Sequence, residues 1–167
     1  DRSNRYAADF SPIDEGHLTT AALAGEVVFA KEDTEGPTGD VRDNNEVAVR
    51  VAGSSQVVTY AHLQKDGALV EVGDFVLPGD PIGLAGNTGS SESTHLHIDV
   101  RAGHRLGPSV PWRFATFGES REPKVGDAIR SENRALRELL GPWVAFERKV
   151  GLAKSLGRPE LVSKQRN

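Results

Sequence analysis

His95 and His97, separated by a single leucine, are the residues of this 167-residue chain whose type and spacing point most directly to chemistry. Side chains of a β-strand alternate between its two faces, so residues two apart point the same way. Both imidazoles can then serve one metal ion or one reacting atom of a substrate. The alternative is that two of the five histidines share an exposed strand face by chance. A lone His-x-His pair does not decide between the two, so the rest of the sequence must.

Composition restricts the kind of site that these histidines can build. The chain has no cysteine, so disulfides and thiolate metal sites are excluded, and a zinc site must use histidine, aspartate or glutamate. The length suits one domain with a single core. No apolar run approaches the ~20 residues that cross a bilayer, so we expect no transmembrane segment. The chain begins without Met, which indicates a processed or trimmed product.

Charge is distributed unevenly along the chain. Residues 1–120 carry 9 Lys and Arg against 18 Asp and Glu, whereas residues 121–167 carry 11 against 6. The end of the chain is therefore basic, although the whole chain has a net charge of −4. A solvated helical face accounts for this excess better than attraction to an anionic polymer does, and we expect no nucleic-acid partner.

The elements that must position the histidines are predicted to be short strands. Between Thr20 and Phe117 the sequence alternates β-type runs with glycine, and residues 25–30, 46–51 and 56–61 are the clearest of these runs. Gly53-Ser54 is typical of a hairpin turn between two of them. Residues 34–45, rich in Gly, Asp and Asn, are typical of a surface loop.

The pattern changes after Gly118. Ser131 is placed to cap a helix, and Gly141-Pro142 ends that helix and begins a second one. Apolar residues then recur at helical spacing, at Trp143, Phe146, Val150 and Ala153. We predict a β-domain over residues 1–119 and a helical C-terminal extension over residues 120–167, packed on it.

A glycine-punctuated string over residues 70–83 is shared by two kinds of domain. In biotinyl and lipoyl carrier domains a similar string frames a hairpin that bears a modified lysine. No lysine occurs between Asp66 and Pro123 here, so the carrier interpretation lacks its functional atom.

Five further segments accompany this string: Tyr6–Phe10, Ala24–Val28, Tyr60–Leu63, Gly86–Ser90 and His95–Val100. In order and spacing they resemble the lysostaphin-type zinc metallopeptidases, the M23 family. The resemblance covers about residues 5–117. It implies a mainly β fold, a lysostaphin-type antiparallel β-sheet domain, here with a C-terminal helical appendix. The histidine pair would lie at the floor of a groove.

The resemblance also implies the roles of four residues. Asp9 and His97 match metal ligands of one zinc ion, and His62 and His95 match the two histidines of the site that do not bind the metal. Zinc lowers the pKa of bound water to about 7. Histidines beside it can accept a proton and donate to the developing oxyanion. The implied activity is a zinc-dependent endopeptidase that cuts bacterial cell-wall (peptidoglycan) peptides, in an extracytoplasmic location.

One position departs from the family pattern. The first ligand, a histidine four residues before Asp9, is replaced by Arg5. A guanidinium stays protonated and offers no lone pair to zinc. Two ligands then remain, fewer than the three of a normal catalytic site. Asp99 shares the face of the histidine pair, but it lies where the family has a non-ligand glutamate.

Several interpretations of Arg5 stay open at the level of sequence. Arg5 could form an ion pair with Asp9 in the space of the metal. Alternatively a histidine from before Asp1, the amide oxygen of Asn4 or His17 could supply the missing ligand. The matching functional alternative to the peptidase is a catalytically degenerate member of the same fold that serves as a binding or regulatory module.

Overall fold

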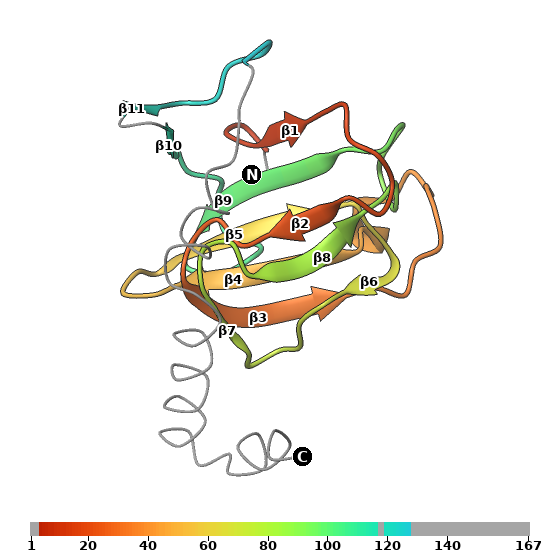
Figure 1. Cartoon of the computed structure of the whole chain (residues 1–167), viewed down its shortest axis with the longest axis horizontal. Helices are drawn as coiled ribbons and strands as arrows, with labels where there is room; N and C mark the ends of the chain where they lie inside the picture. Colours follow the sequence, from red (N-terminus) through yellow and green to blue (C-terminus); the bar gives the residue numbers. More distant parts are fainter. Residues whose placement is uncertain (1–3, 117–118, 128–167) are drawn as a thin grey trace. The chain divides into compact units, whose positions relative to one another are not determined.

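Strands are the main secondary structure of the residues that the structure describes, as the sequence predicts (Figure 1). The computed structural model describes residues 4–116 and 119–127, and these residues belong to one compact unit that spans residues 1–131. The helices predicted within residues 120–167 lie outside the described residues. Among the residues described, no helix is long and apolar enough to cross a membrane.

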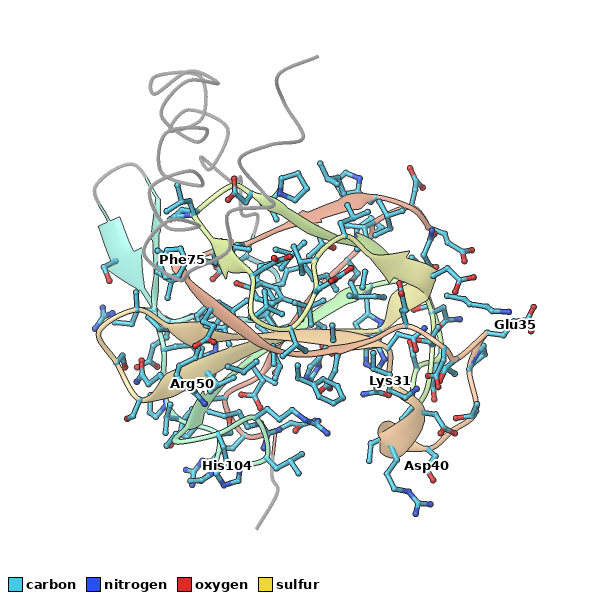
Figure 2. The ribbon with its side chains drawn as sticks, turned by 90° about the horizontal axis from the view of Figure 1, so that it is seen from below. Lys31, Glu35, Asp40, Arg50, Phe75 and His104 are labelled. Atoms are coloured by element: carbon cyan, nitrogen blue, oxygen red, sulfur yellow. The ribbon has the colours of Figure 1, made fainter. Side chains whose placement is uncertain are left out.

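The larger sheet has six strands and is antiparallel throughout, as expected of the predicted mainly β domain. Its central hairpin joins the two β-rich runs through the turn at Gly53, as expected. The predicted loop over residues 34–45 contains one short helix, η1 (Val41–Asp43), and Figure 2 shows Glu35 and Asp40 pointing outward from this loop. In spatial order the strands are β1 (Ala8–Phe10), β9 (Leu96–Ala102), β5 (Gln56–Ala61), β4 (Glu46–Val51), β3 (Gly25–Lys31) and β7 (Phe75–Val76).

A second, three-stranded sheet lies against one face of the larger one (Figure 1). It consists of β2 (Leu18–Thr20), β8 (Pro81–Ala85) and β6 (Leu63–Ala68), in that order. A separate hairpin pairs β10 (Phe114–Thr116) with β11 (Glu119–Arg121). The glycine-rich string over residues 70–83 therefore connects the two sheets, because it contains β7 of one and most of β8 of the other.

The core lies between the two sheets. In the register of the larger sheet Val47 pairs with Tyr60, which in turn pairs with Ile98, so these side chains share one face. The next row on that face contains Val49, Val58 and Val100. Leu63 and Ile82 meet these rows from the smaller sheet. Val47, Val49, Tyr60, Leu63 and Ile82 are each at most 1% exposed, so this face supplies most of the hydrophobic stabilisation.

The opposite face of the larger sheet carries the residues of chemical interest. Asp9, His97, Ala61 and Glu46 are consecutive partners across β1, β9, β5 and β4. Residues paired across neighbouring strands project to the same face, and this row is one residue out of step with the core rows. The alternation that buries Ile98 and Val100 therefore turns His97 away from the core.

Candidate functional site

Three histidines from two distant parts of the sequence converge at one end of the larger sheet. His62 connects β5 to β6, His95 lies just before β9, and His97 lies within β9. One ring nitrogen from each lies within 4.8 Å of those of the other two. The ring centroids of His62 and His95 are 4.6 Å apart, and those of His62 and His97 are 5.6 Å apart. We call these three residues the histidine cluster.

His62 is the one residue between β5 and β6, where the chain passes from one sheet to the other. The strand before it belongs to the six-stranded sheet and the strand after it to the three-stranded sheet. Its φ of 64° lies in the left-handed region, where a bulky residue is strained. Such strain persists only where the surroundings enforce it and is concentrated at functional sites. Here it directs the imidazole toward the other two histidines.

The ring of His62 is held by a backbone acceptor. Its Nδ1 lies 2.8 Å from the carbonyl oxygen of Thr88, so Nδ1 carries the hydrogen and donates it, and the lone pair of the neutral ring is on Nε2. The residue is only 4% exposed. Burial lowers the pKa of His62 to about 4, with a smaller contribution in the same direction from His95 and His97. The imidazole is therefore neutral at pH 7.

Thr88, within the Gly86–Gly89 segment, anchors this part of the site. Its hydroxyl donates to the carbonyl of Leu63 at 2.8 Å and accepts from the backbone N–H of Asn45 at 3.1 Å. Gly89 has a φ of 70°, and a Cβ on it would lie 2.1 Å from the side-chain oxygen of Asn44. The segment that the sequence analysis matched only as a family motif thus carries the hydrogen-bond acceptor for His62.

His95 is fixed in a similar way. Its Nδ1 lies 2.8 Å from the carbonyl of Ser93 and 3.3 Å from the hydroxyl of Ser91. The carbonyl can only accept, so Nδ1 donates and the lone pair of the neutral ring is again on Nε2. The side chain is 15% exposed, as is that of His97. Both rings are therefore accessible from solvent, in contrast to the buried ring of His62.

Asp9 joins the cluster from β1, the edge strand. It is paired with His97 in the sheet register, although 88 residues separate the two in sequence. Its Oδ1 accepts from His97 Nδ1 at 2.8 Å and lies 3.6 Å from His95 Nε2. The carboxylate side chain is 60% exposed. The structure thus brings together all four residues, Asp9, His62, His95 and His97, that the sequence singled out.

Arg5 lies outside this arrangement. Its guanidinium lies 5.5 Å from the centroid of the Tyr6 ring, and the ion pairs that Asp9 forms in the described part of the chain go to histidines, not to Arg5. Asn4 and His17, two of the three suggested replacement ligands, are also placed elsewhere. The amide oxygen of Asn4 accepts from Arg101 at 2.6 Å, and His17 is exposed and is not a member of the cluster.

Three hydrogen bonds tie the segment that contains Arg5 to the body of the domain. Besides the Asn4 contact, the N–H of Tyr6 donates to Ser109 Oγ at 3.2 Å, and the carbonyl of Tyr6 accepts from Trp112 Nε1 at 2.6 Å. Trp112 is partly buried and also packs against the core. These contacts hold the backbone near Arg5 in place without directing its side chain toward Asp9.

Asp99 belongs to this anchoring network. It is fully buried, forms an ion pair with Arg101 at 2.7 Å and accepts from Ser109 Oγ at 2.7 Å. Arg101 also donates to the carbonyl of Gly107 at 3.0 Å. Asp99 therefore shares the strand of the histidine pair but is committed to a structural ion pair. Sequence reasoning missed Ser109 and Arg101, because no local motif announces either contact.

A second ion pair lies farther along the row of His97. Glu46 accepts from Arg105 at 2.6 Å, and the Arg105 guanidinium lies 3.7 Å from the centroid of the Phe29 ring. Burial raises the pKa of Glu46, while Arg105 and, more weakly, Arg101 and His97 oppose that shift. This pair was not foreseen from the sequence. The row therefore places a partly buried carboxylate near the histidines, and Arg105 already neutralises its charge.

The donor set of the site suits a zinc ion. Three imidazoles are ligands that zinc prefers, and catalytic zinc sites combine three protein ligands with one open position. In His62 and His95 the hydrogen bond made by Nδ1 leaves Nε2 to bind a metal, which is how histidine ligands are commonly oriented. The cluster therefore fits zinc, whereas the position of Arg5 does not.

Comparisons with known proteins identify a matching family and a shared fold. The sequence model of peptidase family M23 matches residues 5–108. An uncharacterized metalloprotease of Buchnera aphidicola is 50% identical over 46 residues, which cover 28% of this chain and 12% of that protein. The chain thus spans a small part of the length of this curated relative.

Two solved structures share the fold. The catalytic domain of lysostaphin, an antimicrobial peptidase from Staphylococcus simulans, is 26% identical with a TM-score of 0.51, covering 64% of this chain and 74% of that one. The catalytic domain of EnpA, a prophage-encoded M23 protein from Enterococcus faecalis, was solved as a point mutant and is 23% identical with a TM-score of 0.52. That match covers 63% of this chain and 73% of that one.

Proposed function

Because this chain belongs to peptidase family M23, we propose that it is a zinc-dependent endopeptidase domain that hydrolyses peptides of bacterial cell-wall peptidoglycan. The observation that carries the proposal is the convergence of His62, His95 and His97 beside the carboxylate of Asp9. A domain that acts on cell-wall peptides works outside the cytoplasm, so the proposed location is extracytoplasmic.

The four residues would share two tasks, holding the metal and moving a proton. Zinc, when bound, supplies a Lewis acid that polarises the scissile carbonyl and promotes ionisation of water. The family pattern assigns Asp9 and His97 to the metal, and His62 and His95 to proton transfer and oxyanion stabilisation. With Arg5 in the chain this division leaves the metal with two protein ligands, one fewer than a catalytic site normally has.

The neutral state of His62 is compatible with either task. A buried imidazole whose pKa is about 4 stays unprotonated at pH 7 and keeps its lone pair. His95 is within 3.6 Å of Asp9 and is accessible to solvent, so a peptide carbonyl could approach it. The partly exposed Asp9, His95 and His97 then form the side of the site that a substrate would meet first.

A second candidate function is a binding or regulatory module with no hydrolytic activity. The observation in its favour is the direct hydrogen bond between Asp9 and His97, together with an arginine where the family has its first ligand. In that case the same surface would bind cell-wall peptide without cleaving it.

Cleavage of purified peptidoglycan distinguishes the two functions. The chain, saturated with zinc, should release new amino termini from the peptidoglycan, and His97→Ala should abolish this release. His17→Ala is the matched control, because His17 is an exposed histidine outside the cluster, and it should cleave at the wild-type rate. Peptidoglycan binding without any release of amino termini by the zinc-saturated chain would contradict the peptidase and support the binding module.

A further inference from the structure

We propose that the metal of this chain is held by all three histidines, His62, His95 and His97, while Asp9 orients His97 rather than binding the ion. This inference rests on the proposed function and deepens it, since it names the ligands on which the metal-dependent activity relies. It differs from the family pattern, in which His62 and His95 do not bind the metal. The division of tasks changes because Arg5 removes a ligand from one end of the site.

The first support is the direction of the ring lone pairs. His62 and His95 each use Nδ1 to donate to a backbone carbonyl, of Thr88 and Ser93 respectively, at 2.8 Å. A neutral imidazole has one donor and one acceptor nitrogen, so Nε2 is the acceptor in both. Neither ring can turn its Nδ1 toward a metal without losing that hydrogen bond. Both are thus prepared to bind through Nε2.

The second support is the contact between Asp9 and His97. A carboxylate that accepts from one nitrogen of a histidine fixes the tautomer and raises the basicity of the other nitrogen, which then binds metal more strongly. Asp9 Oδ1 makes this contact with His97 Nδ1 at 2.8 Å. The carboxylate side chain is 60% exposed, whereas the His97 side chain is 15% exposed. This geometry is the one expected of an orienting carboxylate beside a ligand.

The third support is the distribution of possible donors. At the β1 end Arg5 cannot bind a metal, and the amide oxygen of Asn4 is already bonded to Arg101. At the other end three imidazole nitrogens lie within 4.8 Å of one another, close enough for small side-chain rotations to bring them around one ion. Of the described residues, only the histidine cluster offers three nitrogen ligands at one point.

The consequence is an altered distribution of roles. If His62 and His95 bind the ion, neither is free to carry a proton, and Asp9 becomes the group of the site that can accept one. Its Oδ1 lies 3.6 Å from His95 Nε2, so it stays beside the point where the three rings meet. The domain would then use a three-histidine metal site with a carboxylate at its open side.

Zinc affinity of variants tests the proposal without any measurement of cleavage. We expect His95→Ala, His97→Ala and His62→Asn each to weaken zinc binding by more than about 100-fold, because each removes a ligand. Asparagine replaces His62 because it tolerates the left-handed backbone better than alanine does. Asp9→Ala should weaken binding only about 10-fold to 100-fold, the range for a residue that orients a ligand. His17→Ala should bind zinc as the wild type does.

The family pattern gives the opposite result. If Asp9→Ala loses zinc as completely as His97→Ala while His95→Ala and His62→Asn keep wild-type affinity, the three-histidine site is wrong. It is also wrong if the wild-type chain binds no zinc at equilibrium. A zinc titration of the wild-type chain, followed through the imidazole nitrogen resonances, avoids any variant that fails to fold. It should shift the resonances of all three clustered histidines, and shifts confined to His97 would overturn the proposal.

These outcomes separate the inference from the proposed function. If zinc is bound through Asp9 and His97 and the chain cleaves peptidoglycan, the peptidase function is supported and the three-histidine site is wrong. If zinc is bound through three histidines but the zinc-saturated chain does not cleave peptidoglycan, the three-histidine site is supported and the peptidase function is wrong.

Discussion

The two ends of the site differ in how firmly the fold holds them. At one end His62 is buried and its ring is hydrogen-bonded to Thr88, whose hydroxyl is in turn hydrogen-bonded to Leu63 and Asn45. At the other end Asp9 lies on a three-residue edge strand that is paired on one side only, and its carboxylate is 60% exposed. Neighbouring residues support the backbone there but do not enclose the side chains.

The difference indicates where a change of ligand is tolerated. Substitution at the exposed edge alters few contacts, so an arginine can replace a ligand there without disturbing the core. The histidine cluster is joined to the interior, where each lost contact costs stability. A metal site that loses its edge ligand can therefore persist only by relying on the firmer end, which is the basis of the three-histidine proposal.

The largest predicted effect on the free energy of unfolding concerns the buried end of the site, where Thr88 and Gly89 support His62. Gly89→Ala places a Cβ against Asn44 at a left-handed φ, so we expect the free energy of unfolding to fall by about 3 kcal/mol. Gly53→Ala is the matched control, because Gly53 also has a left-handed φ but has no atom within 4 Å of the added Cβ. It should cost about 1 kcal/mol. Urea unfolding measures both, and equal losses would contradict the crowding at Gly89.

The second prediction concerns alkaline pH. Burial raises the pKa of Tyr60 to about 12, from an ordinary value of 10.0. Between these values the unfolded chain loses the proton first, so stability falls as pH rises from 10 to 12, by about 2–3 kcal/mol in total. Below pH 10 this contribution is fully present.

Tyr60→Phe provides the comparison. It removes the acceptor of the Ala22 N–H, so we expect a loss of about 1 kcal/mol at pH 7. Its stability should fall less steeply than that of the wild type between pH 10 and 12. If the two curves run parallel over that range in denaturant titrations, Tyr60 does not keep its proton in the folded state as described.

The third prediction concerns the contacts that hold the segment before the edge strand β1. Ser109→Ala removes the acceptor of the Tyr6 N–H and a donor to the buried Asp99, so we expect a loss of about 1–2 kcal/mol. Amide exchange of residues 6–9 should become faster, while exchange in β5 should be unchanged. Uniform acceleration across both strands would show that the edge and the centre of the sheet are not separable.

The smallest effect is predicted for Arg5→His, which restores the ligand of the family pattern. If three histidines already hold the metal, zinc affinity should change by less than about 10-fold. A gain of several hundredfold in zinc affinity would mean that the histidine cluster alone does not hold the metal, and that Arg5 limits metal binding. Titration with zinc against a competing chelator measures the change.

Sequence reasoning identified the main strands, and it singled out four residues that lie together in the structure. Alternation of apolar residues identifies strands such as β4 and β5, and a glycine at the turn identifies their hairpin. The His-x-His spacing placed two rings on one face. Asp9 was found only through the family resemblance, because its register against His97 depends on a pairing across 88 residues of sequence.

The sequence could not predict contacts between groups that are distant in the chain, or contacts made to backbone atoms. The hydrogen bond from His62 to the carbonyl of Thr88 spans 26 residues, and any residue at position 88 would have offered a carbonyl. The left-handed backbone of His62 has no glycine or asparagine to signal it. The burial of Asp99 depends on Arg101 and Ser109, and polar residues on a strand usually indicate an exposed face.

The most direct test of the three-histidine site is the X-ray absorption spectrum of the zinc-loaded 167-residue chain, which counts the imidazoles bound to the metal. Three-histidine binding predicts three imidazole nitrogens and an additional oxygen from solvent. One imidazole together with oxygen ligands alone would place the metal at Asp9 and His97 and would contradict the central claim.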